Sequence, residues 1–202
     1  FHPIDWMQSR FDAVMAFVAD TDALIIDLSE NGGGYSPSDA YLASYFFNGE
    51  PGIWSSSYTR PTDQTESVNL FEDISGARYL DRPVYILVSK NTFSLAEQLA
   101  YGLKHFGKAT IVGETSSGAA HAIDIGYLNE NFFLQVPISY NIHPVTKTDW
   151  EGTGVIADIQ TQPNQAKAKA HLAALELLSA AATNERIVKW YGDILAELTA
   201  SE

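Results

Sequence analysis

The hexapeptide Thr92-Phe93-Ser94-Leu95-Ala96-Glu97 holds a serine in a place suited to nucleophilic attack. It follows an apolar run and opens a helical pattern, and parallel α/β sheets place their sites beyond the carboxyl ends of strands. Backbone N–H groups and the dipole at a helix N-terminus favour the negative charge that forms when a serine attacks a carbonyl. Ser94 and Glu97 also have the spacing of a capping box, which is a purely structural device. Taken alone, the hexapeptide favours capping over catalysis.

A glycine-rich loop, Asn31-Gly32-Gly33-Gly34, follows another apolar run. Glycine lets a backbone approach a ligand closely, and the N–H groups of such a loop can hold an oxyanion. A tight strand-to-helix turn is the commoner use of such a loop. The segment is neither the phosphate-binding G-x-x-x-x-G-K-[ST] loop nor a G-x-G-x-x-G fingerprint.

An acid occurs in a third glycine-containing loop, where Glu151 precedes Gly152-Thr153-Gly154. A carboxylate in this position could orient a histidine or stabilise its charged form. The alternative is a glutamate that is simply solvated.

The five histidines supply the candidates for a general base. His121 is the most plausible one within the chain, because it follows a Gly- and Ser-rich stretch and lies 27 residues after Ser94. His143 is the second candidate, and a surface or hydrogen-bonded role is the alternative for each. No two histidines have the i, i+4 spacing of a helical metal site, so we expect neither a metal nor a cofactor.

These residues need elements that position them, and the hydrophobic pattern predicts such elements. Short apolar runs at 23–28, 84–88 and 109–112 are typical of strands buried on both faces. A helical pattern at 5–19 precedes these runs, and helical patterns at 37–47 and 94–107 separate them. Asp5 is a plausible N-cap of the first helix. Strand, helix and strand therefore recur with short connections, which predicts a parallel sheet covered by helices.

The rest of the chain is less regular. Residues 48–80 are expected to be a long polar excursion with one strand. Residues 122–127 and 132–138 predict a hairpin with its loop at 129–131. Helices are expected at 164–182 and 186–199. We therefore expect a core over residues 1–182 and a C-terminal helical extension over 183–202.

Composition excludes several classes of function. The 202 residues are 46% hydrophobic and 18% charged, which is enough to bury a core. A net charge of −13 argues against a nucleic-acid partner and against an anionic membrane surface. The chain has no cysteine, which excludes thiol catalysis and disulfides. No run of about 18 apolar residues occurs, so no membrane span is expected.

Four motifs follow one another in a distinctive order, and together they cover much of the chain. They are Asp27-Leu28-x-x-Asn31-Gly32-Gly33-Gly34, Thr92-Phe93-Ser94-x-Ala96-Glu97, Val112-Gly113-Glu114-Thr115-x-x-Gly118 and Glu151-Gly152-x-Gly154-Val155-x-x-Asp158. This succession resembles the C-terminal processing, or tail-specific, serine peptidase family. The branch it resembles most includes interphotoreceptor retinoid-binding protein and the tricorn core peptidase.

The resemblance implies an α/β fold of the Clp protease/crotonase-like type, built from stacked ββα units with C-terminal helices. It also implies a serine-type endopeptidase that forms an acyl-enzyme on Ser94 and acts on unfolded or C-terminal polypeptide. The oxyanion hole would come from the N–H groups of Leu95 and of Gly33 or Gly34. Glu151 would support the catalytic histidine.

The sequence departs from the family pattern in ways that bear on the base. Ser29 stands where the family commonly has arginine. The bacterial tail-specific branch uses a lysine about 25 residues beyond the serine. No lysine lies between Lys108 and Lys147 here, although His121 lies near that place. In the histidine-using branch the base lies upstream, so the resemblance favours a histidine before Phe1, in an N-terminal part outside this chain.

The family resemblance also covers a second use of the same fold. A non-catalytic domain could bind an apolar ligand such as a retinoid or fatty acid, with Ser94 only capping a helix. The resemblance favours a bacterial periplasmic or secreted location, and the sequence leaves the oligomeric state open.

Overall fold

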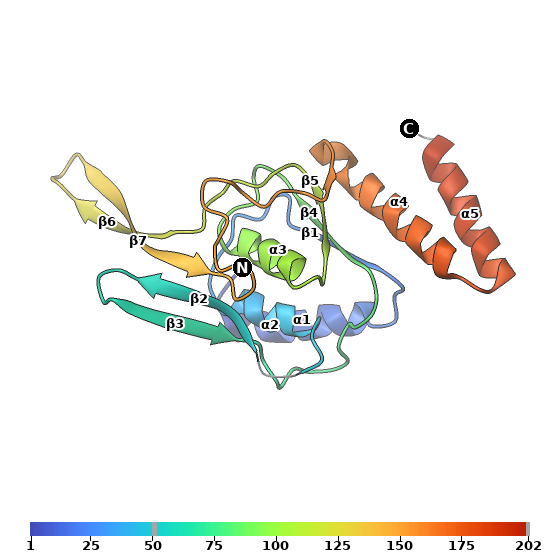
Figure 1. The fold of residues 1–202 in the computed structure, drawn as a ribbon, viewed down its shortest axis with the longest axis horizontal. Coiled ribbons are helices and arrows are strands. Elements are labelled where there is room, and N and C mark those ends of the chain that lie inside the picture. The colour runs from blue at the N-terminus through green and yellow to red at the C-terminus, as the bar shows by residue number, and fades with distance from the viewer. Residues whose placement is uncertain (50–51, 201–202) are drawn as a thin grey trace.

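The computed structural model describes residues 1–49 and 52–200, and its centre is a parallel sheet with helices on both faces (Figure 1). The sheet has the order β1-β4-β5-β8, with every neighbouring pair parallel. Its strands are β1 (Leu24–Asp27), β4 (Val84–Val88), β5 (Thr110–Gly113) and β8 (Ile159–Gln160). The predicted strand, helix and strand alternation is therefore present.

The central strand β4 divides the core into two layers, because alternate side chains point to opposite faces of a sheet. Val84, Ile86 and Val88 pack with three helices in the larger cluster. Those helices are α1 (Ile4–Val18), α2 (Ser38–Ser44) and α3 (Leu95–His105). Tyr85 and Leu87 pack on the other face against alanines of α4 (Pro163–Ala181). All five residues of β4 are buried, as the unbroken apolar run predicts.

A second, antiparallel sheet has the order β3-β2-β7-β6. It contains β2 (Ile53–Thr59), β3 (Gln64–Asn69), β6 (Ala122–Tyr127) and β7 (Phe133–Ile142). The buried Asp39 of α2 ties this sheet to the core, since Trp54 Nε1 and Gln98 Nε2 donate to its Oδ2 at 2.6 and 2.8 Å. Burial raises the pKa of Asp39 to about 6.

The β6–β7 hairpin and the two C-terminal helices project from opposite sides of this body (Figure 1). The β6–β7 hairpin carries a series of exposed apolar side chains that includes Tyr127, Phe132 and Leu134. On the other side, α5 (Glu185–Ala200) packs along α4. The division into a core at 1–182 and an extension at 183–202 stays a prediction, and residues 201–202 of that extension lie outside the described residues. Among the described helices, none combines the length and apolar character that a membrane span requires.

The structure differs from the sequence expectations at three places. Pro3 occupies the N-cap of α1, and Asp5 lies inside the first turn, so the prediction of Asp5 as N-cap is wrong. The excursion at 48–80 contains two strands instead of one. The strand β1 is half-buried instead of fully buried, because it lies at the edge of its sheet.

The packing of α3 against the second sheet gives a first prediction. A Cβ at Gly102 would overlap the Trp54 indole, so Gly102→Ala should destabilise the fold by about 1–3 kcal/mol. A Cβ at Gly192 on α5 would meet nothing within 4 Å, so Gly192→Ala is the matched control. The control should stabilise its helix by up to about 1 kcal/mol. Urea unfolding measures both, and an unchanged midpoint for Gly102→Ala would contradict this packing.

Candidate active site

The loops that follow β1, β4 and β5 meet at the carboxyl edge of the parallel sheet, as parallel strand order requires. Several hydrogen bonds fasten the first loop to the second, and two of them lie next to the glycines and Ser94. Thr92 Oγ1 donates to the Leu28 carbonyl at 2.8 Å, and Phe93 N–H donates to the Asn31 carbonyl at 3.1 Å. The glycine loop and Ser94 are therefore held side by side.

Ser94 has an unusual backbone. It precedes α3 with φ 54° and ψ −122°, a conformation that L-residues rarely adopt. Such a conformation costs about 1–3 kcal/mol and persists only where the surroundings fix it. Ser94 is half-buried, so its hydroxyl is not sealed in the core.

Glu97 is fully buried and fixes the start of α3. Its Oε2 accepts hydrogen bonds from Ser94 N–H at 2.8 Å and from Ala119 N–H at 3.0 Å. Its Oε1 accepts from Ser116 Oγ and from Gly118 N–H, both at 2.6 Å. The capping box that the sequence predicts is present, and its glutamate also holds the loop after β5.

The glycine loop lies against the serine. A Cβ placed on Gly33 would come within 2.8 Å of the Ser94 Cβ and 2.9 Å of the Leu95 nitrogen, so only glycine fits there. Gly33 N–H donates to Asn31 Oδ1 at 2.9 Å and is already used. Within the part of the chain that the structure describes, no acceptor is found for the N–H of Gly34 or of Leu95. Of the two glycines that the sequence left open, Gly34 has the available donor.

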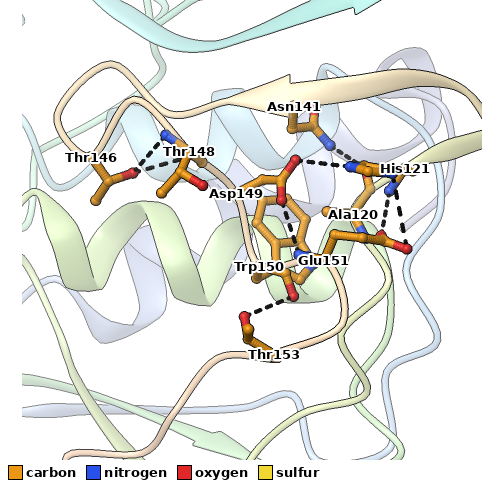
Figure 2. A network of polar contacts seen from close by, with 9 residues as sticks. All are labelled: Ala120, His121, Asn141, Thr146, Thr148, Asp149, Trp150, Glu151 and Thr153. Atoms are coloured by element: carbon orange, nitrogen blue, oxygen red, sulfur yellow. Dashed lines mark hydrogen bonds and ion pairs between the residues drawn. The ribbon is translucent and has the colours of Figure 1, made fainter.

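The predicted acid and base lie together on the neighbouring loops (Figure 2). Glu151 Oε2 accepts from Ala120 N–H at 2.7 Å and from His121 N–H at 3.0 Å. The ring of His121 lies between two carboxylates, with Nδ1 4.0 Å from Glu151 Oε1 and Nε2 3.2 Å from Asp149 Oδ2. Asp149 was missed by the sequence reasoning, although its place two residues before Glu151 was available as a signal.

Further contacts connect this acid–base pair with the serine. Gly152 N–H donates to the Gly118 carbonyl at 2.9 Å, and Ser116 Oγ accepts from Val155 N–H at 2.6 Å. The loop bearing Glu151 therefore packs on the loop that Glu97 ties to Ser94. Among the described residues, no hydrogen bond joins Ser94 to His121 itself.

His143 is placed differently from His121. It is buried, with its ring 4.7 Å from that of Phe106 and 5.5 Å from that of Tyr101. Burial, and next the charge of His105, lower the pKa of His143 to about 4. The contacts of His143 are those of a packed core ring. Among residues 1–49 and 52–200, no group of three or more His, Asp or Glu side chains is placed to hold a metal ion.

Solved structures share this fold. A photosystem II D1 C-terminal processing protease is 22% identical with a TM-score of 0.59, over 77% of this chain and 38% of that one. A lipoprotein from Streptococcus agalactiae is 17% identical with a TM-score of 0.61, over 85% and 61%. Mature CPAF is 16% identical with a TM-score of 0.62, over 84% and 45%. The predicted α/β fold of the Clp protease/crotonase-like class is confirmed, and the chain spans less than two thirds of each of these relatives.

The structural likeness shows the fold alone, whereas a match to a sequence profile identifies the family. The profile of peptidase family S41 matches residues 5–161, which is more than half of the chain. The chain belongs to peptidase family S41. The family resemblance that the four motifs predict is therefore confirmed.

The contacts of Glu97 give a second prediction. Glu97→Gln replaces one acceptor oxygen by an NH2 group that faces backbone donors, so we expect a loss of about 2–4 kcal/mol in the free energy of unfolding. Glu66→Gln on the exposed face of β3 is the control and should stay within about 0.5 kcal/mol. Denaturant unfolding measures both, and equal stability of the two variants would contradict a structural role for Glu97.

The lowered pKa of His143 gives a third prediction, on the pH dependence of stability. The folded pKa of about 4 lies below the ordinary value of 6.5, so the unfolded chain binds the proton more readily. The stability from His143 is complete above pH 6.5 and is lost as pH falls towards 4. Relative to His143→Phe, the wild-type chain should lose on the order of 2 kcal/mol across this window. Asp39, whose pKa is raised, changes stability with pH in the opposite direction, but it is present in both proteins and its effect cancels in the comparison. Curves of unfolding free energy against pH that run parallel for the two proteins would contradict the burial of the His143 ring.

Proposed function

We propose that this chain is the catalytic core of a serine endopeptidase that hydrolyses unfolded or C-terminal polypeptide segments through an acyl-enzyme on Ser94. The observation that carries the proposal is the backbone of Ser94, which is held at φ 54° on a helix N-terminus with Gly33 packed against its Cβ. A capping role needs no such strain. A serine nucleophile does, when a sharp turn must present its hydroxyl between oxyanion donors.

The chemistry assigned to these residues is acyl transfer. Ser94 Oγ attacks the scissile carbonyl carbon, and its proton passes to a histidine base. The N–H groups of Leu95 and Gly34 stabilise the oxyanion, and removing one such donor typically costs about 3–4 kcal/mol of barrier lowering. The base then gives the proton to the leaving amine as the C–N bond breaks. Water attacks the ester in the second half of the reaction and restores Ser94.

The base in this proposal is His121 or a histidine that precedes residue 1. His121 is supported by its partners, because its ring lies between the carboxylates of Asp149 and Glu151, which hold it in place. Against it stands the lack of a hydrogen bond to Ser94 among the described residues. A catalytic hydrogen bond often tightens only when substrate binds, so His121 stays a candidate base.

One observation favours the second candidate function, the binding of an apolar ligand. A cavity of about 400 Å³ lies between α1 and β1 and is lined mostly by apolar side chains. Met7, Phe11, Leu24 and Ile26 belong to this lining. A cavity of this size and chemistry suits a fatty chain.

A fluorophosphonate probe separates the two functions, because it transfers its phosphonyl group to a reactive serine and releases fluoride. Wild-type chain should be labelled on Ser94, while Ser94→Ala and Ser94→Gly should not. Glycine also relieves the backbone strain, so Ser94→Gly should be more stable than Ser94→Ala by about 1 kcal/mol. A folded full-length protein that binds a fatty acid and stays unlabelled would overturn the peptidase proposal.

The same probe tests the base. If His121 takes the proton, His121→Asn should slow labelling by about 100-fold or more. His105→Asn is the control and should leave the rate unchanged, because His105 packs beside Tyr101. Equal labelling rates for wild type and His121→Asn would assign the base to another histidine.

A further inference from the structure

A groove of about 400 Å³ lies beside His121, across the second sheet. Tyr58 of β2 and Tyr140 of β7 are directly opposite in the strand register, and their rings lie 5.1 Å apart. The ring of His121 follows in the same row, 6.2 Å from that of Tyr140. The groove therefore begins at the proposed general base and runs along two aromatic rings.

Arg60 lines the far part of this groove. Its backbone N–H donates to the Ile138 carbonyl at 2.8 Å, which continues the β2–β7 pairing and places Arg60 at a defined position. Within the part of the chain that the structure describes, its guanidinium has neither a hydrogen-bond partner nor an ion-pair partner. Arg60 is exposed, so its guanidinium is open to a ligand in the groove.

The acids that contact residues of the groove each have a partner there. Asp63 accepts a hydrogen bond from Tyr58 Oη at 2.8 Å. At the other end, Asp149 and Glu151 contact His121. Arg60 is the one arginine or lysine among the described residues that line the groove. Its fork of N–H donors matches a carboxylate, and the two tyrosine rings and Pro137 offer an apolar wall for the chain that bears it.

We propose that this groove binds a carboxylate of the polypeptide substrate and that Arg60 is the residue that determines this specificity. The inference rests on the proposed function, since it names the class of substrate segment that the same site accepts. The carboxylate is supplied by an Asp or Glu side chain or by a free chain terminus, and both present the same two oxygens to Arg60.

Binding to the Ser94→Ala chain tests this without any turnover. Three labelled peptides share one apolar sequence: a blocked neutral form, a blocked form with one Gln replaced by Glu, and the neutral form with a free C-terminal carboxylate. Fluorescence anisotropy at low salt measures the affinity of each peptide. At least one of the two carboxylate peptides should bind about tenfold more tightly than the neutral peptide. The peptide that gains identifies the source of the carboxylate.

Substitution of Arg60 supplies the decisive comparison. In the Ser94→Ala background, Arg60→Gln should remove the preference, Arg60→Lys should keep part of it, and the exposed Arg186→Gln should leave it intact. Equal affinities for all three peptides, no measurable binding, or a preference that survives Arg60→Gln would overturn the proposal. Fluorophosphonate labelling of the wild-type chain is independent of these affinities, so the failure of one proposal is distinguishable from the failure of the other.

Discussion

The candidate site depends on one buried carboxylate. Glu97 is excluded from solvent, and both of its oxygens act only as acceptors, which is the role of an ionised carboxylate. A buried charge costs several kcal/mol unless hydrogen bonds compensate it. Here the donors come from the first residue before α3 and from the loop after β5. The same four contacts that satisfy the charge therefore fix the geometry of the site, and they allow Ser94 to keep a strained backbone.

The two sheets position different parts of the candidate site. The parallel sheet brings the glycine loop, Ser94 and the 116–121 loop to one edge, because all three follow carboxyl ends of its strands. The antiparallel sheet supplies the groove that contains Arg60, and His121 lies where the 116–121 loop enters its strand β6. The buried Asp39 joins the two bodies through Trp54 and Gln98, and Gln98 lies one helical turn after Ser94.

Much of the core was predictable from the sequence, since short apolar runs and amphipathic periods report burial directly. The order of the four motifs predicted the family and the fold class, although each motif alone was weak. The sequence predicted only the capping contact between Glu97 and Ser94. The other hydrogen bonds of Glu97 were not predictable, because tertiary structure alone brings Ser116, Gly118 and Ala119 to it. The same holds for Asp149 beside His121. The strand β3 in the 48–80 segment was not predicted, because it is largely exposed and its polar residues lack the apolar pattern of a buried strand.

The central claim is that the hydroxyl of Ser94 forms a covalent acyl intermediate. Pre-steady-state hydrolysis of a p-nitrophenyl ester tests it most directly, because ester acylation makes small demands on the leaving-group acid. We predict a burst of nitrophenol of about one equivalent per folded chain, followed by slower turnover, with the added acyl mass on the peptide that contains Ser94. A folded chain that releases nitrophenol without a burst and carries no acyl mass on that peptide would contradict the account.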